Sequence, residues 1–337
     1  MKYKATLVVE NPIYYNNYRF SKDIRDNLNA YDITLKEELK KHDIDLATED
    51  INKIEEADIV IYNSAPGART AKKHNQKKYL LIVEPPVVLP ANWNKKNHEG
   101  FDRIFTWDES LVDNKKYFLL RFGYRFRYDP GDIKSNDRQL CTMISGFKYF
   151  YLHPDELYSE RYKAVKWFTK YHPENFKYYG KGWPNYLFRP HLNKFFCRAP
   201  QWILKLFLLE NISYGGVLES KHSTLQKFRF SICYENMRGI PGYVTEKIFD
   251  SFSAGCIPIY WGASNIEKLI PEDCYIDRRK FESYEELYKH ICSLNERTLA
   301  QILNNISDYL SSGRANMFKA STYAQTLTSY ILKDIKK

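Results

Sequence analysis

The sequence of 337 residues lacks any apolar run that approaches the roughly 18 residues needed to span a bilayer. Its longest apolar stretch, Trp202–Leu209, is interrupted by Lys205. The first apolar run, Ala5–Val9, is short and has no small-residue cleavage pattern, so it predicts a first strand and not a secretion signal. These absences favour a cytoplasmic protein. One amphipathic segment, Pro200–Glu210, either packs in the core or lies peripherally on the inner face of the cytoplasmic membrane.

Cysteine is also scarce, and its six copies form no CxxC pair. They are Cys141, Cys197, Cys233, Cys256, Cys274 and Cys292. Most of them occupy apolar, strand-like segments, so we expect reduced, buried thiols. No histidine and cysteine cluster has the spacing of zinc ligands, and a zinc site is therefore not expected.

Acidic residues are in deficit, because 51 Lys and Arg face 41 Asp and Glu, which gives a net charge of +10. This excess suits a nucleic acid, an anionic membrane surface or a phosphate-bearing ligand, or belongs to a merely soluble basic protein. Aromatic residues make up 16% of the chain, so some are expected to line polar clefts. The P-loop, HExxH and GxGxxG motifs are absent. No basic and aromatic run follows a nucleic-acid module, so a non-catalytic nucleic-acid binder is the less favoured alternative.

Short apolar strands alternate with amphipathic helices in two successive blocks, which the polar stretch Arg127–Arg138 separates. Continuous apolar strands suit sheets that are covered on both faces. The blocks predict two α/β domains, at residues 1–130 and 138–310, facing each other across a cleft at the carboxyl ends of their strands. Residues 311–337 are expected to form a helix that packs back on the first domain. Strands are predicted at Tyr3–Val9, Ala57–Tyr62, Tyr79–Val83, Asp102–Trp107, Tyr117–Arg121, Leu140–Ser145, Phe176–Tyr179, Phe228–Tyr234 and Cys256–Trp261, and helices at Thr34–His42, Asp155–Tyr171, Thr245–Ala254 and beyond Tyr284.

The richest concentration of polar groups lies where one predicted strand ends and a helix begins. The strand Phe228–Tyr234 is followed by Glu235-Asn236, by a loop with glycine and proline, and by the helix start Tyr243–Lys247. A helix amino terminus and Lys247 in its first turn suit a diphosphate. Glu246 beside them cannot favour a phosphate and is expected to bond the neutral hydroxyls of a sugar.

This segment resembles the donor-binding signature of glycosyltransferase family 10, the α1,3/4-fucosyltransferases, in its bacterial form. Glu235-Asn236, Tyr243–Lys247, Gly255, Pro258 and Gly262 match the family pattern in order and spacing. The resemblance implies a GT-B-like fold of two Rossmann-like domains. It also implies an inverting transfer of L-fucose from GDP-fucose to a hydroxyl, O3 of N-acetylglucosamine or glucose, in a bacterial surface glycan such as a lipopolysaccharide or a lipid-linked oligosaccharide.

Weaker resemblance outside that segment supplies two further site residues. Glu160-Arg161 lies on a helix after the strand Leu140–Ser145, and the resemblance gives Arg161 the role of reaching the donor diphosphate. Ile82-Val83-Glu84 ends a strand of the first domain, and the resemblance makes Glu84 the general base. A plain carboxylate at the end of a strand is the alternative for Glu84.

The resemblance distributes the remaining roles over the helix start. Lys247 and the helix amino terminus at Thr245 are expected to neutralise the leaving GDP without a required metal, and Mn²⁺ or Mg²⁺ is at most a stimulant. Glu246 or Glu235 stabilises positive charge on the sugar, whereas Asn236 and Tyr243 position the nucleoside or the fucose. A different GDP- or UDP-linked deoxysugar is the alternative donor.

Three features depart from the family or compete with it. Met237 stands where the family often has Ser or Thr, which puts a hydroxyl contact there in doubt. Residues 183–216 and 1–75 have no quotable counterpart. Asp43-Ile44-Asp45 is a DxD motif, which holds Mn²⁺ in another glycosyltransferase fold, but it lies far in sequence from the donor segment and is expected to be surface charge.

Overall fold

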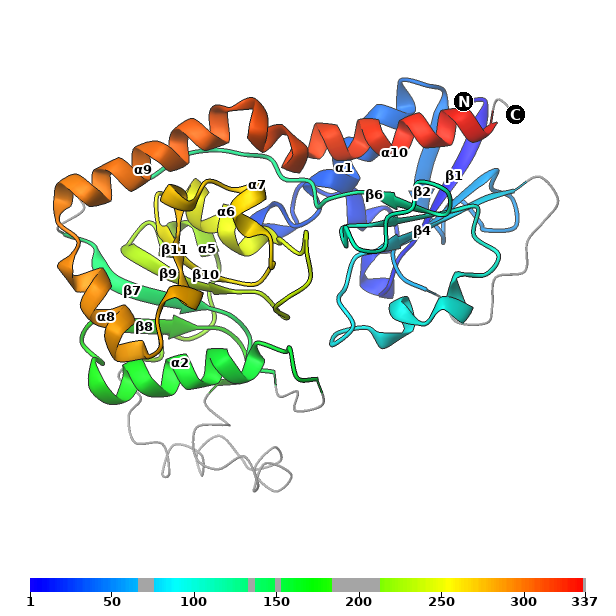
Figure 1. The fold of residues 1–337 in the computed structure, drawn as a ribbon. Helices are drawn as coiled ribbons and strands as arrows, with labels where there is room; N and C mark the ends of the chain where they lie inside the picture. Colours follow the sequence, from blue (N-terminus) through cyan, green and yellow to red (C-terminus); the bar gives the residue numbers. More distant parts are fainter. Residues whose placement is uncertain (66–75, 133–136, 149–152, 184–212, 336–337) are drawn as a thin grey trace, which may run out of the picture.

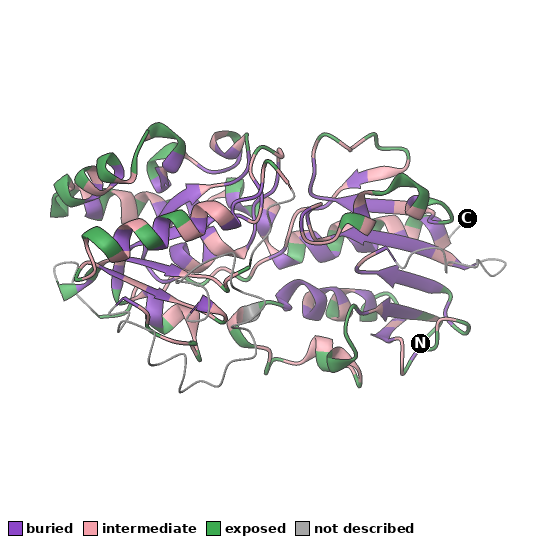
Figure 2. Cartoon of the chain, turned by 90° about the horizontal axis from the view of Figure 1, so that it is seen from below, coloured by how far each residue is buried: buried purple, intermediate pink, exposed green. Residues whose placement is uncertain are grey.

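In the part of the chain that the structure describes, the amino-terminal domain is built around a six-stranded sheet. The computed structural model describes residues 1–65, 76–132, 137–148, 153–183 and 213–335. In this part of the chain the first sheet has the strand order β2-β1-β3-β4-β5-β6, and all neighbours are parallel. Its strands are mostly buried, as continuous apolar runs require in a sheet covered on both faces (Figure 2). They are β1 (Tyr3–Val8), β2 (Ile44–Thr48), β3 (Ile59–Tyr62), β4 (Lys77–Ile82), β5 (Arg103–Thr106) and β6 (Tyr117–Leu119).

The second sheet carries the carboxyl-terminal domain and is also parallel, with the order β11-β10-β9-β7-β8 (Figure 1). Its strands are β7 (Gln139–Ile144), β8 (Phe176–Tyr179), β9 (Phe228–Tyr234), β10 (Ile257–Trp261) and β11 (Ile276–Asp277). The helices of this domain are α2 (Tyr158–Tyr171), α5 (Lys221–Leu225), α6 (Glu246–Ser253), α7 (Ile266–Leu269), α8 (Tyr284–Ser293) and α9 (Glu296–Ser311). Short 3-10 turns occur at Pro12–Tyr14, Tyr18–Phe20, Arg25–Asn27, Pro90–Trp93, Lys95–His98, Glu272–Cys274, Arg278–Lys280 and Gly313–Phe318.

The chain crosses between the domains twice, and the two crossings lie side by side. On the outward crossing Tyr124 donates its N–H to the carbonyl of Phe318 at 2.7 Å, and on the return Ala320 donates to the carbonyl of Tyr124 at 2.9 Å. Helix α10 (Ala320–Ile335) then packs beside α1 (Ala30–Lys40) in one apolar cluster with strands of the first sheet (Figure 1). The last helix therefore ties the carboxyl terminus to the amino-terminal domain.

Most predicted strands and helices are confirmed with small shifts at their ends, but the first helix begins earlier than predicted. Thr34 is not its N-cap. It lies inside α1, where its hydroxyl donates to the carbonyl of Ala30 at 2.8 Å. Such back-bonding within a helix satisfies a Thr hydroxyl and makes it a poor marker of a helix start.

Two other predictions concern residues away from the cleft. Cys292 is exposed, which corrects the expectation of burial for that thiol, whereas Cys141, Cys233, Cys256 and Cys274 are buried. Cys197 and the amphipathic segment of residues 200–210 lie outside the described residues. None of the helices in the described ranges combines the length and apolar character that a membrane span requires.

Candidate active site between the two domains

A cleft of about 570 Å³ separates the domains, and a second hollow of about 370 Å³ opens beside it. The cleft is lined by residues at the carboxyl ends of β1, β3 and β4 and by the start of α6. The hollow is lined by residues at the carboxyl ends of β7, β8 and β9. Both share Asn236, Glu246 and Lys247. The two spaces therefore meet at the segment that the sequence singled out, at the edge where parallel sheets bind ligands.

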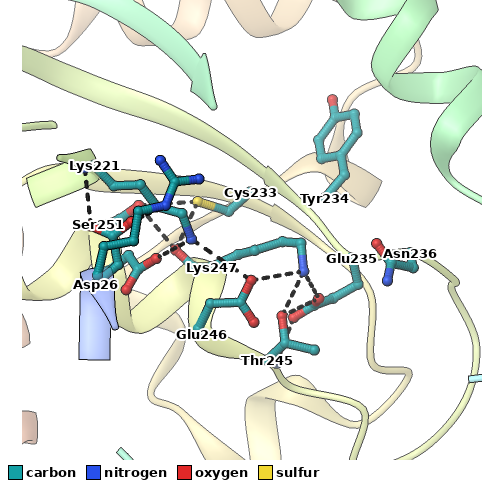
Figure 3. Close-up of polar contacts among 12 residues, drawn as sticks. Asp26, Lys221, Cys233, Tyr234, Glu235, Asn236, Thr245, Glu246, Lys247 and Ser251 are labelled. Carbon is teal, nitrogen blue, oxygen red and sulfur yellow. Dashed lines mark hydrogen bonds and ion pairs between the residues drawn. The ribbon is translucent and has the colours of Figure 1, made fainter. Parts of the chain in front are cut away.

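Glu235 is the buried centre of this segment (Figure 3). One carboxylate oxygen accepts the main-chain N–H of Thr245 at 2.7 Å. The other accepts the Thr245 hydroxyl at 2.6 Å and the Lys247 ammonium at 3.2 Å. Since Glu235 is fully buried and lines neither space, it anchors the start of α6 and does not face a ligand. This revises the expectation that Glu235 contacts the donor or stabilises positive charge on the sugar.

Thr245 occupies the N-cap position of α6, as predicted, but its side chain makes no capping hydrogen bond. Its hydroxyl is used twice elsewhere, as a donor to Glu235 and as an acceptor from Lys247 at 2.8 Å. The loop therefore fixes the Lys247 side chain at the expense of the usual cap. Gly262 is required beneath this arrangement, because a Cβ there would overlap Glu235 and Tyr260.

Lys247 and Glu246 form the charged floor shared by the two spaces. The Lys247 ammonium lies 3.5 Å from the Glu246 carboxylate. Burial opposes the charge of Glu246, but Lys247 and Lys221 outweigh it and lower the pKa of Glu246 to about 2. Burial likewise opposes the charge of Lys247, whereas Glu235 and Glu246 raise its pKa above the ordinary value. Both residues are therefore ionised at neutral pH.

Arg161 places a second cation in the hollow, and this cation is nearly sealed from water. It extends from α2 and is 5% exposed. Its guanidinium donates to the Tyr234 carbonyl at 2.7 Å and to the side-chain oxygen of Asn236 at 2.9 Å. None of the ion pairs among the described residues includes Arg161. A buried guanidinium held by neutral acceptors favours an anionic ligand, because burial of an unpaired charge is costly.

Glu84 approaches the same floor from the amino-terminal domain. It follows β4, and its main-chain carbonyl accepts the Trp93 indole N–H at 3.0 Å. Glu84 lines the cleft. Burial raises the pKa of Glu84 above its ordinary value, an effect that nearby Lys247 and Lys148 reduce and Glu246 increases. The structure thus brings Glu84 within electrostatic reach of the predicted donor segment, although the two are about 150 residues apart in the sequence.

Tyr243 and Met237 belong to an apolar cluster that joins the domains at the end of the cleft. The cluster also contains Trp107 and Tyr158, and the rings of Tyr243 and Trp107 lie 4.4 Å apart. Met237 is buried in this cluster. An apolar side chain suits this position, at which the resembling family often has Ser or Thr. Tyr243 lines the cleft while its ring is packed in this cluster, so it forms a fixed part of the cleft wall.

A glycine keeps the domains close at this interface. Gly242 has a positive φ of 85°, and a Cβ there would overlap the carbonyl of Trp107. Next to it, the Glu109 carboxylate accepts hydrogen bonds from Arg121 at 2.6 Å and from Asn265 at 2.9 Å. Only glycine fits this approach without strain.

Several lining residues were missed from the sequence. Lys221 donates to Asp250 at 3.0 Å and lies 4.0 Å from Glu246, and its main-chain N–H is held by Asp26 of the other domain at 3.1 Å. Asp250 follows Glu246 by four residues, so both lie on one face of α6, and this spacing could have predicted that Asp250 lies near the site. No sequence pattern around Lys221 or Asp26 indicates that they lie near the site.

The competing DxD motif lies at the opposite edge of the first sheet. Tyr3 is the register partner of Ile44, so Asp43 and Asp45 stand at the amino ends of β1 and β2. Neither aspartate lines the cleft or the hollow. In the described ranges, no three residues among His, Cys, Asp and Glu are grouped so that they could hold a metal ion.

Comparisons with known proteins agree with this picture over one part of the chain. Residues 215–302 match the model of the family described as glycosyltransferase family 10 (fucosyltransferase), C-terminal. The chain is 34% identical over 77 residues to an alpha-(1,3)-fucosyltransferase from Helicobacter pylori, which is 23% of this chain and 16% of that protein. It is 35% identical over 79 residues to an alpha-(1,4)-fucosyltransferase from Arabidopsis thaliana, which is 23% of this chain and 20% of that protein. The matched segments thus span at most a fifth of these relatives.

Solved structures support the fold over almost the whole chain. A crystal structure of an alpha1,3-fucosyltransferase with GDP-fucose superposes with a TM-score of 0.56 at 17% identity and covers 99% of this chain and 90% of that chain. Anabaena HepE in complex with UDP-glucose superposes with a TM-score of 0.58 at 11% identity and covers 98% of this chain and all of that chain. The predicted GT-B-like arrangement of two α/β domains is therefore confirmed.

The part matched by the family model begins in front of α5 and includes the whole motif from Glu235 to Lys247. Residues 215–302 are therefore similar to the C-terminal part of glycosyltransferase family 10, the fucosyltransferases, over the segment that carries the motif.

Proposed function

We propose that the protein transfers L-fucose from GDP-fucose to a hydroxyl of an acceptor glycan, with inversion at the anomeric carbon. One observation carries the proposal. The segment that matches the fucosyltransferase family forms one wall of an interdomain cleft, and a carboxylate of the other domain, Glu84, stands opposite to it. An inverting transfer needs a base and a leaving group on opposite sides of the sugar, and this arrangement supplies both sides.

The donor side binds the diphosphate and neutralises it as it leaves. The buried Arg161 guanidinium and the Lys247 ammonium both line the hollow in which the nucleotide is proposed to lie. A unit charge pair about 4 Å apart is worth roughly 4 kcal/mol at an effective dielectric constant near 20. If only part of this energy appears in the transition state, the rate still rises on the order of a hundredfold. No metal is required for this step in the proposal.

The acceptor side activates the hydroxyl. A sugar hydroxyl is a poor nucleophile, and the proton it loses as the new bond forms is taken by the Glu84 carboxylate in the proposal. Glu246, which stays ionised between its two lysines, stabilises the positive charge that develops on the fucose ring. Asn236 is held by Arg161 at the junction of the two spaces and positions the donor there.

The acceptor we favour is O3 of N-acetylglucosamine or glucose in a bacterial surface glycan, presented as an oligosaccharide or a lipid-linked glycan at the inner face of the cytoplasmic membrane. The support for a sugar acceptor is the cleft itself, which combines carboxylates with aromatic side chains such as Tyr14 and Tyr31. The segment proposed to contact the membrane, residues 200–210, lies outside the described residues.

The test is a transfer assay in EDTA with GDP-fucose, other GDP- and UDP-linked deoxysugars, and a panel of oligosaccharides. Products are read by mass spectrometry and linkage analysis. We expect a gain of one fucose from GDP-fucose alone, and persistence of activity without a divalent cation. Transfer from another nucleotide sugar in preference to GDP-fucose would refute the donor. Activity that appears only after Mn²⁺ is added would refute the metal-independent departure of GDP.

A further inference from the structure

One buried amide group beside Glu84 is incompletely hydrogen-bonded. Asn63 directly follows β3, is 4% exposed and lines the cleft. Its main-chain N–H donates to the Val8 carbonyl at 3.3 Å, which fixes the residue against β1. Its side-chain Oδ1 is buried and has no hydrogen-bond partner within the described ranges. A buried acceptor that stays unpaired is costly, and because Asn63 lines the cleft, a ligand bound there could supply the missing donor.

Asn63 belongs to a row of polar residues at one edge of the sheet. Strands β1, β3 and β4 are neighbours in this order, and Tyr62 is the register partner of Val8 on one side and of Leu80 on the other. Glu10 follows the end of β1 by two residues, as Glu84 follows β4, and all three polar residues line the cleft. The sheet thus presents accepting oxygens side by side, next to the proposed base.

We propose that Asn63 and Glu10 bind the acceptor sugar. Each accepts a hydrogen bond from an O–H or N–H group of the sugar, and the group bound by Asn63 is next to the hydroxyl that reacts. This inference rests on the proposed function. Asn63 Oδ1 accepts the neighbouring O–H or N–H of the sugar, and the Glu10 carboxylate accepts a second one at the rim. Asn63 is thus a positioning and specificity residue, because it brings the reacting hydroxyl to Glu84 without taking part in the proton transfer.

The charges around this subsite define the class of acceptor. Glu10 and Glu84 are both carboxylates, and the nearby Arg19 is paired with the buried Asp32 at 2.6 Å. Arg19 also lies 4.9 Å from the centre of the Tyr14 ring, which helps to fix this aromatic residue in the cleft wall. The two carboxylates repel anions on this side of the cleft, whereas Lys247 and Lys148, the cations that act on Glu84, line the hollow on the donor side. We therefore infer a neutral, polyhydroxylated acceptor and exclude an acidic sugar from this position.

The experiment uses the best acceptor from the oligosaccharide panel and two analogues, each lacking the hydrogen-bond donor on one side of the fucosylated hydroxyl. For the wild type we expect one analogue to have a kcat/KM about tenfold below that of the parent, the effect of one lost hydrogen bond. In Asn63→Ala the acceptor KM should rise about tenfold, and the preference for the parent over that analogue should vanish. The KM for GDP-fucose and its hydrolysis in the absence of acceptor should not change.

Two further variants separate binding from folding. Asn63→Asp keeps an accepting oxygen, so it should keep the preference even if the added negative charge lowers the rate. Asn52→Ala is the matched control, because Asn52 is a buried asparagine of the same domain that donates to the Ala5 and Asp45 carbonyls and does not line the cleft. It should lower the melting temperature and leave the acceptor preference intact.

The possible outcomes separate this inference from the function itself. If the wild type transfers fucose but Asn63→Ala keeps the wild-type acceptor KM and preference, the subsite is wrong and the proposed function stands. If Asn63→Ala loses donor hydrolysis and acceptor binding together, Asn63 is structural and the inference fails. If the wild type neither hydrolyses nor transfers fucose from GDP-fucose, the proposed function itself has failed.

Discussion

Replacement of Glu84 by glutamine should lower kcat/KM for transfer by about a thousandfold, because a positioned general base contributes roughly 10²–10⁴. Glutamine has the same shape and leaves the main-chain carbonyl that accepts the Trp93 indole in place. The affinity for GDP should therefore stay within about twofold of wild type, since the proposed base does not touch the diphosphate. The measurement is steady-state kinetics with isothermal titration of GDP.

The pH profile gives an independent readout of the same group. A base works only when it is deprotonated, so wild-type kcat/KM should rise with pH through the pKa of Glu84 and level off above it. Burial raises that pKa above the ordinary value of 4.5, which moves this acid limb upwards in pH. Glu84→Gln should lack the limb. Near wild-type turnover in the variant, or an unchanged acid limb, would remove Glu84 as the base.

Replacement of Lys247 by methionine should have the second largest effect, in both binding and rate. Loss of a charge-assisted contact should weaken GDP binding about tenfold or more, and loss of its transition-state share should lower kcat/KM on the order of a hundredfold. The variant should also be less stable, because the fully buried Glu235 carboxylate loses its cationic partner.

The double variant Glu235→Gln with Lys247→Met distinguishes these two effects. It removes the stranded carboxylate, so the melting temperature should recover towards that of the wild type. Activity should not recover, since the cation that we propose to face the diphosphate is still missing. Recovery of activity together with stability would mean that Lys247 acts only by neutralising Glu235.

The sequence was most informative where function is encoded locally. The motif from Glu235 to Lys247 lies within one strand, one loop and one helix turn, so its spacing alone placed it at the carboxyl edge of a sheet. Glu84 was predicted from the family resemblance, and its position after an apolar strand agrees with that prediction, because such a residue stands at the same edge of a parallel sheet. Glu10 and Asn63 also follow apolar strands, β1 and β3, so the same pattern places them at this edge of the sheet.

Other features depended on packing that no local pattern contains. The sequence predicted a ligand contact for Glu235, whereas in the structure both of its carboxylate oxygens accept hydrogen bonds from Thr245 and Lys247. These contacts depend on the conformation of the loop, which the sequence pattern does not give. Lys221 reaches Glu246 from a separate helix and is held by Asp26 of the other domain. A Thr before a helical pattern predicts an N-cap, but the preceding turn of α1 was hidden in Ala30–Ile33, a mixed segment without clear helical periodicity.

The most direct test of the account is a crystal structure of the protein with GDP and, in a second crystal, with an uncleavable GDP-fucose analogue. We expect diphosphate oxygens within hydrogen-bonding distance of the Arg161 guanidinium and the Lys247 ammonium. The anomeric carbon should face the Glu84 carboxylate across the cleft. A nucleotide bound away from both cations, or a sugar with its reacting face turned away from Glu84, would contradict the account.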